Sequence, residues 1–507
     1  MPSEYPLILE SAFKNGLKPD DRSPVNAPYL ETCQNVRPTA YGLCSPEAIT
    51  QPISGFTPSI SWPFPMLMRL SDITLILDRT AIYEVTESGW THAQVTTYDL
   101  SDLAEGLAIT GGGVWHIADF RKVLFLTNGS SLLVKLPTTS WKLAVTTDTD
   151  VATLTEHNGR LYLGGVADAT QFATTIWGEL WNEWKKSASE GTMTYTAYSM
   201  NTNVLMWSEP FGGQINEPFA LFISLLGYSD ANLTKFRELA MKLINEGVIG
   251  FLPMEWQGSI KIVKSLGKDL IVYGDNGVTL VSPDHQRVEM LPVGVPGRGC
   301  VAGDKRAHVF VDVEGVLWKM KPGGSIERLG YENQIANMTL ANITGSYDVQ
   351  EDEFYFCDGT AGYVLTPTGL GEVTILPTAL NRCASGLVGI SSNLAVSGAT
   401  VVTEPFDMGV TDLKNVKSVD VLSRGVTTAR AGVDYRHSVR DSFTTGGTVI
   451  GSPEGTFFPR KSGIDFRLRL TGVVGAGDKI ERATIRYEYA SSRSIRGPRG
   501  GAVNESV

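Results

Sequence analysis

Histidine and carboxylate side chains are the first residues to consider for chemistry, because they supply general acids, general bases and metal ligands. The six histidines are scattered along the chain, and no two stand at the spacing of a metal-binding pair. Asp148 and Asp150 lack the glycine and the distal glutamate of a calcium loop. Four carboxylates crowd the stretch from Asp348 to Glu353, where we predict a solvated turn. The sequence therefore predicts no catalytic residue, no metal site and no cofactor.

Sequence motifs of known enzyme classes give the same result. The zinc-protease motif His-Glu-x-x-His, the nucleophile elbow Gly-x-Ser-x-Gly and the P-loop are missing from the sequence. The stretch from Gly294 to Gly299 superficially resembles a nucleotide-binding loop, but no strand–helix unit surrounds it and its proline fits a connecting turn better. The repeated box of sialidases is also absent, and Glu87 to Trp90 is only a fragment of it. We therefore expect a protein that is not an enzyme.

The five cysteines are odd in number and widely spaced, which predicts buried free thiols in a reducing compartment and not a disulfide framework or a zinc ribbon. The first residues lack the basic and apolar regions of a signal peptide. The longest apolar run, residues 218–227, has ten residues, about half of what a membrane-spanning helix needs. We predict synthesis in the cytoplasm and no membrane span.

Basic side chains gather near the C-terminus of an acidic chain. The net charge is -11, from 43 Lys and Arg against 54 Asp and Glu. Proteins whose main role is to bind nucleic acid are normally basic, so general DNA binding is not expected. Residues 460–499 hold ten basic and four acidic side chains, so this segment is about +6 and the rest near -17. The asymmetry predicts that one end docks an acidic partner, although a solvated arginine-rich strand face explains it equally well. The candidate docking residues are Arg467, Arg469, Arg482, Arg486, Arg493, Arg496 and Arg499.

Apolar and aromatic side chains suggest a second site in the middle of the chain. The run from Pro218 to Gly227 is either ordinary core or an exposed tip that meets a partner or narrows a pore. Its candidate gate residues are Phe219, Leu221, Phe222, Ile223, Leu225 and Leu226. Trp177, Trp181, Trp184 and Trp207 could form a sugar-binding platform, but core and interface packing is the favoured interpretation.

The elements that must position these residues are short strands. Apolar runs on either side of a turn occur six times, a pattern typical of antiparallel hairpins. The predicted hairpins cover residues 73–85, 123–136, 152–163, 269–281, 309–320 and 353–365. The turn glycines Gly277, Gly315 and Gly359 are 38 and 44 residues apart, close to the period of roughly 40–45 residues of a four-stranded propeller blade. The gap from Gly159 to Gly277 is expected to hold two or three such units and an insertion.

We therefore predict an all-β protein whose residues 61–405 form a β-propeller of six or seven blades, with a pair of sandwiches as the alternative. An excursion over residues 208–257 interrupts it and contains one amphipathic helix, residues 232–246, with apolar residues at helical spacing. We expect residues 1–60 to form an irregular extended arm that associates with a C-terminal platform domain, residues 406–490. Residues 406–490 alternate in a way that predicts an antiparallel β-sandwich, and residues 491–507 form a flexible polar tail.

The order and texture of these segments resemble the tail hub or nozzle proteins of short-tailed bacteriophages, including the packaged-DNA stabilisation proteins. The resemblance is carried by the opening residues 14–36, by residues 259–278 and 300–312 in mid-chain, and by residues 406–436 and 496–500 near the end. It covers most of residues 1–500, but residues 170–257 have no counterpart.

This resemblance implies a non-enzymatic virion protein that forms a ring, of six subunits in this family, around a DNA channel below the portal and adaptor proteins. Such a ring retains the packaged genome, carries tail fibres or tailspikes and lets double-stranded DNA pass without sequence-specific binding. An acidic body fits this role, because a wall that repels phosphate lets a duplex slide. The alternative prediction is a propeller lectin or glycosidase acting on host-surface polysaccharide, which would need converging carboxylates at the propeller mouth. A monomeric scaffold propeller is a third possibility.

Overall fold

The computed structural model describes residues 4–19, 28–49, 61–70, 73–98, 108–120, 123–135, 141–145, 151–165, 202–208, 250–383, 386–391, 398–409, 412–425, 430–447, 449–450, 455–472, 474–475 and 477–490. All structural statements below concern these residues. Within them, no helix combines the length and the apolar character needed to cross a membrane.

Six successive groups of four antiparallel strands make up the middle of the described chain. The first group contains β5 (Met66–Leu70), β6 (Ile73–Leu77), β7 (Ile82–Thr86) and β8 (Thr91–Gln94). The second contains β10 (His116–Phe120), β11 (Val123–Thr127), β12 (Leu132–Lys135) and β13 (Trp141–Val145), and β9 (Thr97–Tyr98) pairs with β13 at its edge. The third contains β14 (Thr153–His157), β15 (Arg160–Gly164), β16 (Val204–Trp207) and β17 (Gly250–Pro253). The fourth group contains β18 (Ile260–Leu266), β19 (Asp269–Gly274), β20 (Val278–Val281) and β21 (Arg287–Leu291). The fifth contains β22 (Val301–Asp304), β23 (Ala307–Val311), β24 (Leu317–Lys321) and β25 (Ser325–Gly330). The sixth contains β26 (Thr344–Asp348), β27 (Glu353–Cys357), β28 (Gly362–Leu365) and β29 (Leu370–Glu372). The short helices α5 (Glu332–Ile335) and η2 (Leu340–Asn342) separate the last two groups.

These groups are the blades of a β-propeller, because their first strands form a closed ring. Each first strand contacts the first strand of the next blade, and the hairpin β30 (Leu380–Cys383) and β31 (Gly386–Gly389) closes the ring between β26 and β5. The described strands thus give six full blades and a seventh position occupied by a two-stranded hairpin. The second strands β11, β19 and β23 are buried along their whole length, since blades pack face to face, which explains their continuous apolar runs.

All six predicted hairpins are confirmed, and each contains a pair of adjacent antiparallel strands. Gly129, Gly277, Gly315 and Gly359 all lie in the turn between the second and third strands of a blade, so their spacing does report the blade period. Asn158 and Gly159, in contrast, join the first and second strands of the third blade. The prediction of two or three units between Gly159 and Gly277 was wrong, because the described residues of that interval supply three strands of the third blade, β15 to β17, and the first two strands of the fourth.

The expected excursion belongs to the third blade. Residues 166–201 and 209–249 lie outside the described residues, and so do the predicted helix 232–246 and all six gate candidates. The range 208–257 was drawn too wide, because β17 lies inside it and pairs with β16 as the outer strand of the blade.

The remaining strands form a β-sandwich of two sheets. The first sheet contains β3 (Arg37–Thr39), β4 (Gly42–Cys44), β39 (Lys479–Tyr489), β33 (Lys414–Arg424) and β36 (Gly455–Phe457), with β1 (Tyr5–Ile8) on β39 and β37 (Lys461–Gly463) on β33. The second sheet contains β2 (Leu30–Gln34), β32 (Ala399–Thr403), β38 (Asp465–Gly472), β34 (Arg430–Arg436) and β35 (Val449–Ile450). Because β32 pairs with β2 and β38, the sandwich begins before residue 406, the predicted boundary.

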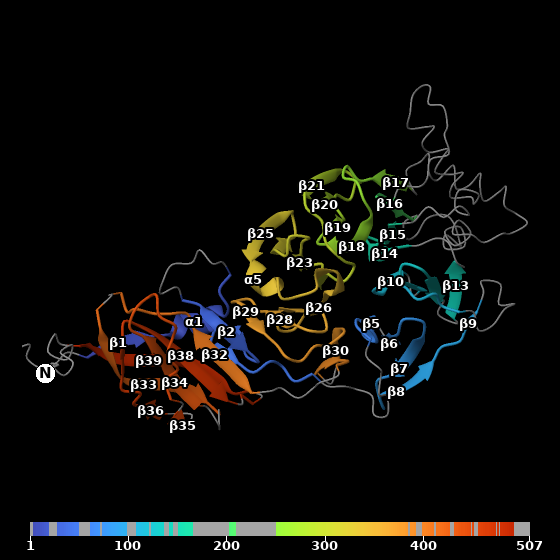
Figure 1. Cartoon of the computed structure of the whole chain (residues 1–507). Coiled ribbons are helices and arrows are strands. Elements are labelled where there is room, and N and C mark those ends of the chain that lie inside the picture. Colours follow the sequence, from blue (N-terminus) through green and yellow to red (C-terminus); the bar gives the residue numbers. More distant parts are fainter. Residues whose placement is uncertain are drawn as a thin grey trace, which may run out of the picture.

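The N-terminal segment is more regular than its sequence indicates. Where we expected an irregular arm, it contains the helix α1 (Glu10–Asn15) and the strands β1 to β4. The strands β1 and β2 take their hydrogen-bonding partners from strands more than 300 residues away, β39 and β32, so the local sequence does not reveal them. Figure 1 shows these blue elements lying among the orange and red strands of the sandwich, at the opposite end of the molecule from the first blades.

The second sheet continues into the sixth blade, so sandwich and propeller share one nine-stranded sheet. Strand β2 pairs with β32 on one side and, in parallel, with β29 on the other. Gly16 sits against this seam with φ +65, where a Cβ atom would lie 2.4 Å from the carbonyl oxygen of Leu370, so glycine is required there. One continuous apolar core runs from the fourth to sixth blades through α1 into both sheets of the sandwich.

The prediction of a solvated turn at residues 348–353 was wrong for its two outer carboxylates. The Asp348 side chain is fully buried and accepts from Arg382 Nε at 2.9 Å, and Glu353 is buried against Arg37. Arg382 also makes two bonds of 2.6 and 2.7 Å to Glu47, which ties the closing hairpin to the sixth blade and the N-terminal segment. Both arginines come from distant parts of the chain, so the local sequence gives no sign of this burial.

Replacing Arg382 with methionine is expected to destabilise the protein by about 3–5 kcal/mol, because it leaves the buried Asp348 carboxylate without its counter-charge. The matched control is Arg328→Met, since Arg328 is 60 % exposed and pairs with Glu332, four residues further along the chain, on the surface; it should cost at most about 1 kcal/mol. Urea unfolding of both variants tests this. Equal midpoints for the two variants would contradict the role of Arg382 in closing the ring.

Candidate functional site

The candidate docking arginines divide between the two outer faces of the sandwich. Phe466, Leu468 and Leu470 of β38 point into the core, so Arg467 and Arg469 lie on the outer face of the second sheet. On β39, Ala483, Ile485 and Tyr487 point inward, so Arg482 and Arg486 lie on the outer face of the first sheet. The predicted basic face is therefore two faces. Arg493, Arg496 and Arg499 lie outside the described residues.

Arg467 and Arg469 are engaged within the sandwich. Arg467 pairs with Glu31 at 2.8 Å, and its guanidinium carbon lies 4.0 Å from the ring centre of Phe443. Arg469 pairs with Asp434 at 3.0 Å and donates to the Gly446 carbonyl. Burial raises the pKa of Glu31, and the charge of Arg467 opposes that rise. These two arginines stabilise the β38–β34 face and are poorly placed to bind a partner.

Arg482 and Arg486 are the better docking candidates. Both are exposed, and no described residue accepts a hydrogen bond from the Arg482 guanidinium or forms an ion pair with it. Arg486 is 51 % exposed and pairs with Asp420 of β33 at 3.3 Å. Such exposed ion pairs are weak, so Arg486 can exchange its partner at little cost.

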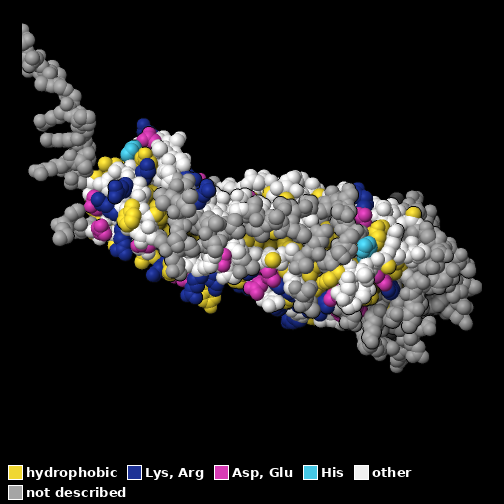
Figure 2. Space-filling model, turned by 90° about the horizontal axis from the view of Figure 1, so that it is seen from below, with side chains coloured by type: hydrophobic (Ala, Val, Ile, Leu, Met, Phe, Trp, Pro, Cys, Tyr) yellow, Lys and Arg dark blue, Asp and Glu magenta, His cyan; other side chains and the backbone are white. Residues whose placement is uncertain are grey.

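The structure also explains why the segment charge overstates the basic character of this end. Basic side chains of the segment pair with acidic ones outside it, as Arg467 does with Glu31, Arg469 with Asp434 and Arg486 with Asp420. Figure 2 shows the result, since blue and magenta side chains alternate with yellow ones at the sandwich end.

Exposed apolar side chains are concentrated on the same end of the molecule. Of the ten large hydrophobic side chains that are exposed among the described residues, seven belong to the sandwich and the N-terminal segment: Tyr5, Ile8, Tyr41, Leu422, Val439, Phe458 and Tyr489. Tyr5 and Tyr489 form an aromatic cluster with Tyr487, with ring centres 5.3 to 5.9 Å apart. Exposed aromatic side chains are typical of protein interfaces.

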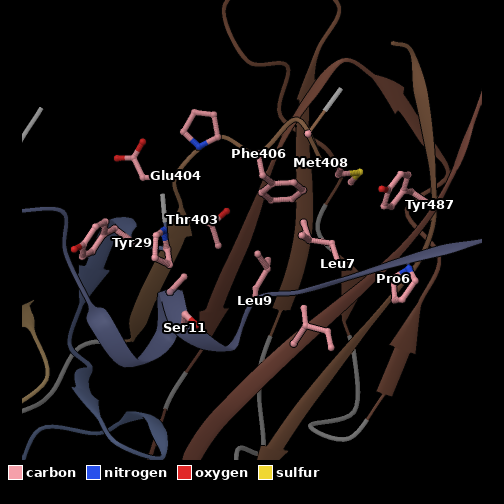
Figure 3. Close-up of a pocket in the computed structure, with 15 residues that line it drawn as sticks. Pro6, Leu7, Leu9, Ser11, Tyr29, Thr403, Glu404, Phe406, Met408 and Tyr487 are labelled. Carbon is pink, nitrogen blue, oxygen red and sulfur yellow. The ribbon is translucent and has the colours of Figure 1, made fainter. Parts of the chain in front are cut away.

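A groove of about 520 Å³ opens beside this cluster, between β1 and the segment after β32. Figure 3 shows Leu7 and Leu9 on one side, and Phe406 and Met408 facing them. Tyr29, Thr403 and Glu404 supply polar groups at one end of the groove. The sandwich thus offers an apolar groove next to the strand β1. Among the described strands, β1 pairs with β39 along one edge and has no partner strand along the other.

Two cavities lie on the propeller axis, because first strands from most blades line them. The smaller, of about 200 Å³, is lined by β5, β10, β14, β18 and β26 and by the segment before β22. The larger, of about 560 Å³, is lined by β5, β22, β26 and β30 and by Lys264. Lys264 of β18 lines both. Asp304 is the one carboxylate among the described residues that line either cavity, and it accepts from Arg306 at 3.1 Å.

The axial cavities therefore differ from the site expected for a glycosidase, which needs two converging carboxylates. The described residues also contain no group of three side chains able to hold a metal ion. Trp207, from the predicted tryptophan platform, is buried and stacks on His285 with ring centres 3.9 Å apart, whereas Trp177, Trp181 and Trp184 lie outside the described residues.

The five cysteines are free thiols in the structure, and all but the half-buried Cys44 are buried. Burial raises the pKa of Cys33, Cys300, Cys357 and Cys383. These thiols are therefore protonated and unreactive at neutral pH, as expected for structural cysteines.

No protein-family model matches the chain, and no curated protein matches its sequence. Solved structures resemble it at low similarity. PorZ of Porphyromonas gingivalis has 11% identity and a TM-score of 0.30, with 66% of this chain and 43% of that chain covered. BBS1N, solved in complex with ARL6DN, has 10% identity and a TM-score of 0.35, with 70% and 90% covered. The extracellular domain of BT4673 from B. thetaiotaomicron has 10% identity and a TM-score of 0.37, with 81% and 47% covered.

The chain thus spans less than half of the PorZ and BT4673 chains that it matches. TM-scores this low carry no argument about family, activity or partners. The propeller assignment rests on the closed ring of strands described above.

The titration of Lys264 provides a test of the axial site. Burial lowers the pKa of Lys264 to about 8, and Asp304 opposes this shift. Between pH 8 and the ordinary lysine value, the unfolded chain keeps a proton that the folded chain has lost, so stability should rise with pH by about 1–3 kcal/mol across this window and stay flat below it.

In phosphate-free buffer, the urea midpoint of the wild type should rise relative to that of Lys264→Met between pH 8 and pH 10. Lys264→Met should also be the more stable protein at pH 7. Parallel pH curves for the two proteins would contradict the placement of a charged lysine in the channel.

Proposed function

We propose that this protein is a structural virion protein, a tail hub or nozzle subunit of a short-tailed bacteriophage, which forms a ring and docks through its sandwich to the portal and adaptor complex. The observation that carries the proposal is the concentration of exposed apolar side chains and exposed arginines at the sandwich end of the molecule. The sequence resemblance to tail hub proteins supplies the identity of the partner.

The first sheet of the sandwich is the face that we assign to docking. Its outer face carries the exposed Arg482 and Arg486, and its β1–β39 edge carries the Tyr5, Tyr487 and Tyr489 cluster and the groove, which lie on the opposite face of the sheet. An exposed arginine and an aromatic cluster around an apolar groove provide the anchors that interfaces use most often. In this proposal the propeller points away from the docking partner.

The acidic character of the rest of the chain supports the second part of the proposal, the passage of DNA. A ring whose wall is acidic on balance repels the phosphate backbone and leaves a duplex free to slide. The ring would retain the packaged genome, permit its ejection and carry fibres or tailspikes. It would be made in the host cytoplasm, as a hexamer by the resemblance, and act without enzymatic activity.

The lectin or glycosidase alternative is less well supported. Its catalytic form needs the paired carboxylates that are missing among the described residues of the axial cavities, and the one described tryptophan of the predicted sugar platform is buried. Gating by residues 218–227 stays a prediction from the sequence, because these residues lie outside the described part of the chain.

Charge reversal tests the docking face. Arg482→Glu combined with Arg486→Glu should abolish attachment to the portal–adaptor complex of the parent phage, because both docking arginines become repulsive toward an acidic partner. Attachment is measured by co-sedimentation of purified protein with the complex, and folding by the melting temperature.

The matched control is Arg430→Glu combined with Arg440→Glu. These two arginines are also exposed and change the net charge by the same amount, but they belong to the second sheet and its loop. We expect this control to attach like the wild type. Attachment of the Arg482 and Arg486 variant at the wild-type level, with an unchanged melting temperature, would rule out the first sheet as the docking face.

A further inference from the structure

The smaller axial cavity of the propeller brings together basic groups from three separate places in the chain. His116 stands at the start of β10 in the second blade, Lys264 on β18 in the fourth, and Arg298 in the segment that leads to the fifth. No carboxylate is among the described residues that line this cavity. In a chain with net charge -11, a cavity lined in this way is a local exception.

Arg298, which lines the cavity, is hydrogen-bonded to the second blade. Its Nη1 donates to the carbonyl oxygen of Asn128 at 2.7 Å, in the turn between β11 and β12 of the second blade. Gly129 makes room for it, since a Cβ atom there would lie 1.6 Å from Nη1. The connection into the fifth blade therefore places a fixed positive charge opposite the second blade.

The polar groups of His116 and Lys264 lack partners that would explain their position. The Nε2 atom of His116 is buried without a hydrogen-bond partner, and the Lys264 ammonium has no acceptor among the described residues. A buried polar group without a hydrogen bond costs about 1–3 kcal/mol. Groups of this kind are expected where a ligand completes the hydrogen bonding.

The neighbours of His116 permit the tautomer that donates from Nε2. Thr153 Oγ1 accepts from the backbone N–H of Val263 at 3.1 Å and lies 3.3 Å from His116 Nδ1. When the Thr153 hydroxyl donates to Nδ1, Nε2 carries the proton. Burial and the charges of Arg298 and Lys264 lower the pKa of His116 to about 3, so the ring is neutral at pH 7 and offers one N–H.

All three side chains thus present donors, and two of them are cationic. We propose that the smaller axial cavity binds a small tetrahedral oxyanion, of the phosphate or sulfate class, held by the Lys264 ammonium, the Arg298 guanidinium and the His116 Nε2–H. A cavity of about 200 Å³ accommodates one such ion with a few water molecules. A tetrahedral ion suits donors that converge from different blades, because its oxygens point in several directions.

The site is independent of the proposed function, since it requires neither a ring nor a phage partner. Its occupant would bring blades two, four and five together around one charge and add to the closure of the ring. Failure of this proposal would leave the docking proposal unaffected, and the reverse also holds.

Isothermal titration of the full chain with inorganic phosphate tests the proposal. We expect one phosphate per chain, and at least a tenfold weaker affinity for Lys264→Met. Lys268→Met is the matched control, because Lys268 is exposed in the turn after the same strand, outside both axial cavities, and should bind like the wild type. Lys264→Arg keeps the charge and should retain most of the affinity.

The proposal is wrong if the wild type binds neither phosphate nor sulfate, or if a folded Lys264→Met variant binds phosphate as tightly as the wild type does. It is also wrong if acetate binds as tightly as phosphate, because that result would assign the site to carboxylates. In a crystal soaked with sulfate, density between Lys264, Arg298 and His116 is the expected result. A sulfate bound only elsewhere would contradict the site.

Discussion

The pairing of β2 with both β29 and β32 is the constraint on which the rest of the structure depends. This pairing joins a propeller blade and a layer of the sandwich into one sheet, so the two parts cannot be positioned independently. Asn35 secures the seam. This buried residue has φ 56, its N–H donates to Glu372 O at 2.8 Å, and its Oδ1 accepts from Thr374 Oγ1 at 2.7 Å. An arm from the start of the chain therefore sets the direction in which the sandwich presents its outer faces.

Local patterns predicted what local interactions determine. The six hairpins and the blade period could be predicted because alternating runs and turn glycines lie within a few residues of one another. Three features could not be predicted: the N-terminal strands, the burial of Asp348 and the place of β32 in the sandwich. Each depends on a partner more than 30 residues away, and Arg37 and Glu353 are 316 residues apart. The site shows the same limit. An arginine count identified a basic segment, but the sequence does not show that β38 and β39 belong to different sheets, or that Arg467 and Arg469 are engaged by acids while Arg482 and Arg486 are exposed.

Charge serves two purposes in this chain. In the described part of the sandwich, five basic side chains pair with acids across neighbouring strands, which stabilises the sheets and lowers the outward charge. Arg482 on the surface and Lys264 in the channel, in contrast, have no ion-pair partner within 4.0 Å among the described residues. The first marks the face that we assign to a protein partner, and the second marks the axial cavity. Neither could be distinguished in the sequence from the partnered cations around it.

The central claim is that the sandwich, and not the propeller, is the docking end of a ring-forming subunit. Cryo-electron imaging of the purified protein and of the particle that carries it tests this claim most directly. The account predicts a ring around a hole wide enough for a DNA duplex, with the sandwich sheets facing the portal–adaptor complex and the propellers outward. A lone molecule in every preparation, or a ring whose propellers face the adaptor, would contradict it.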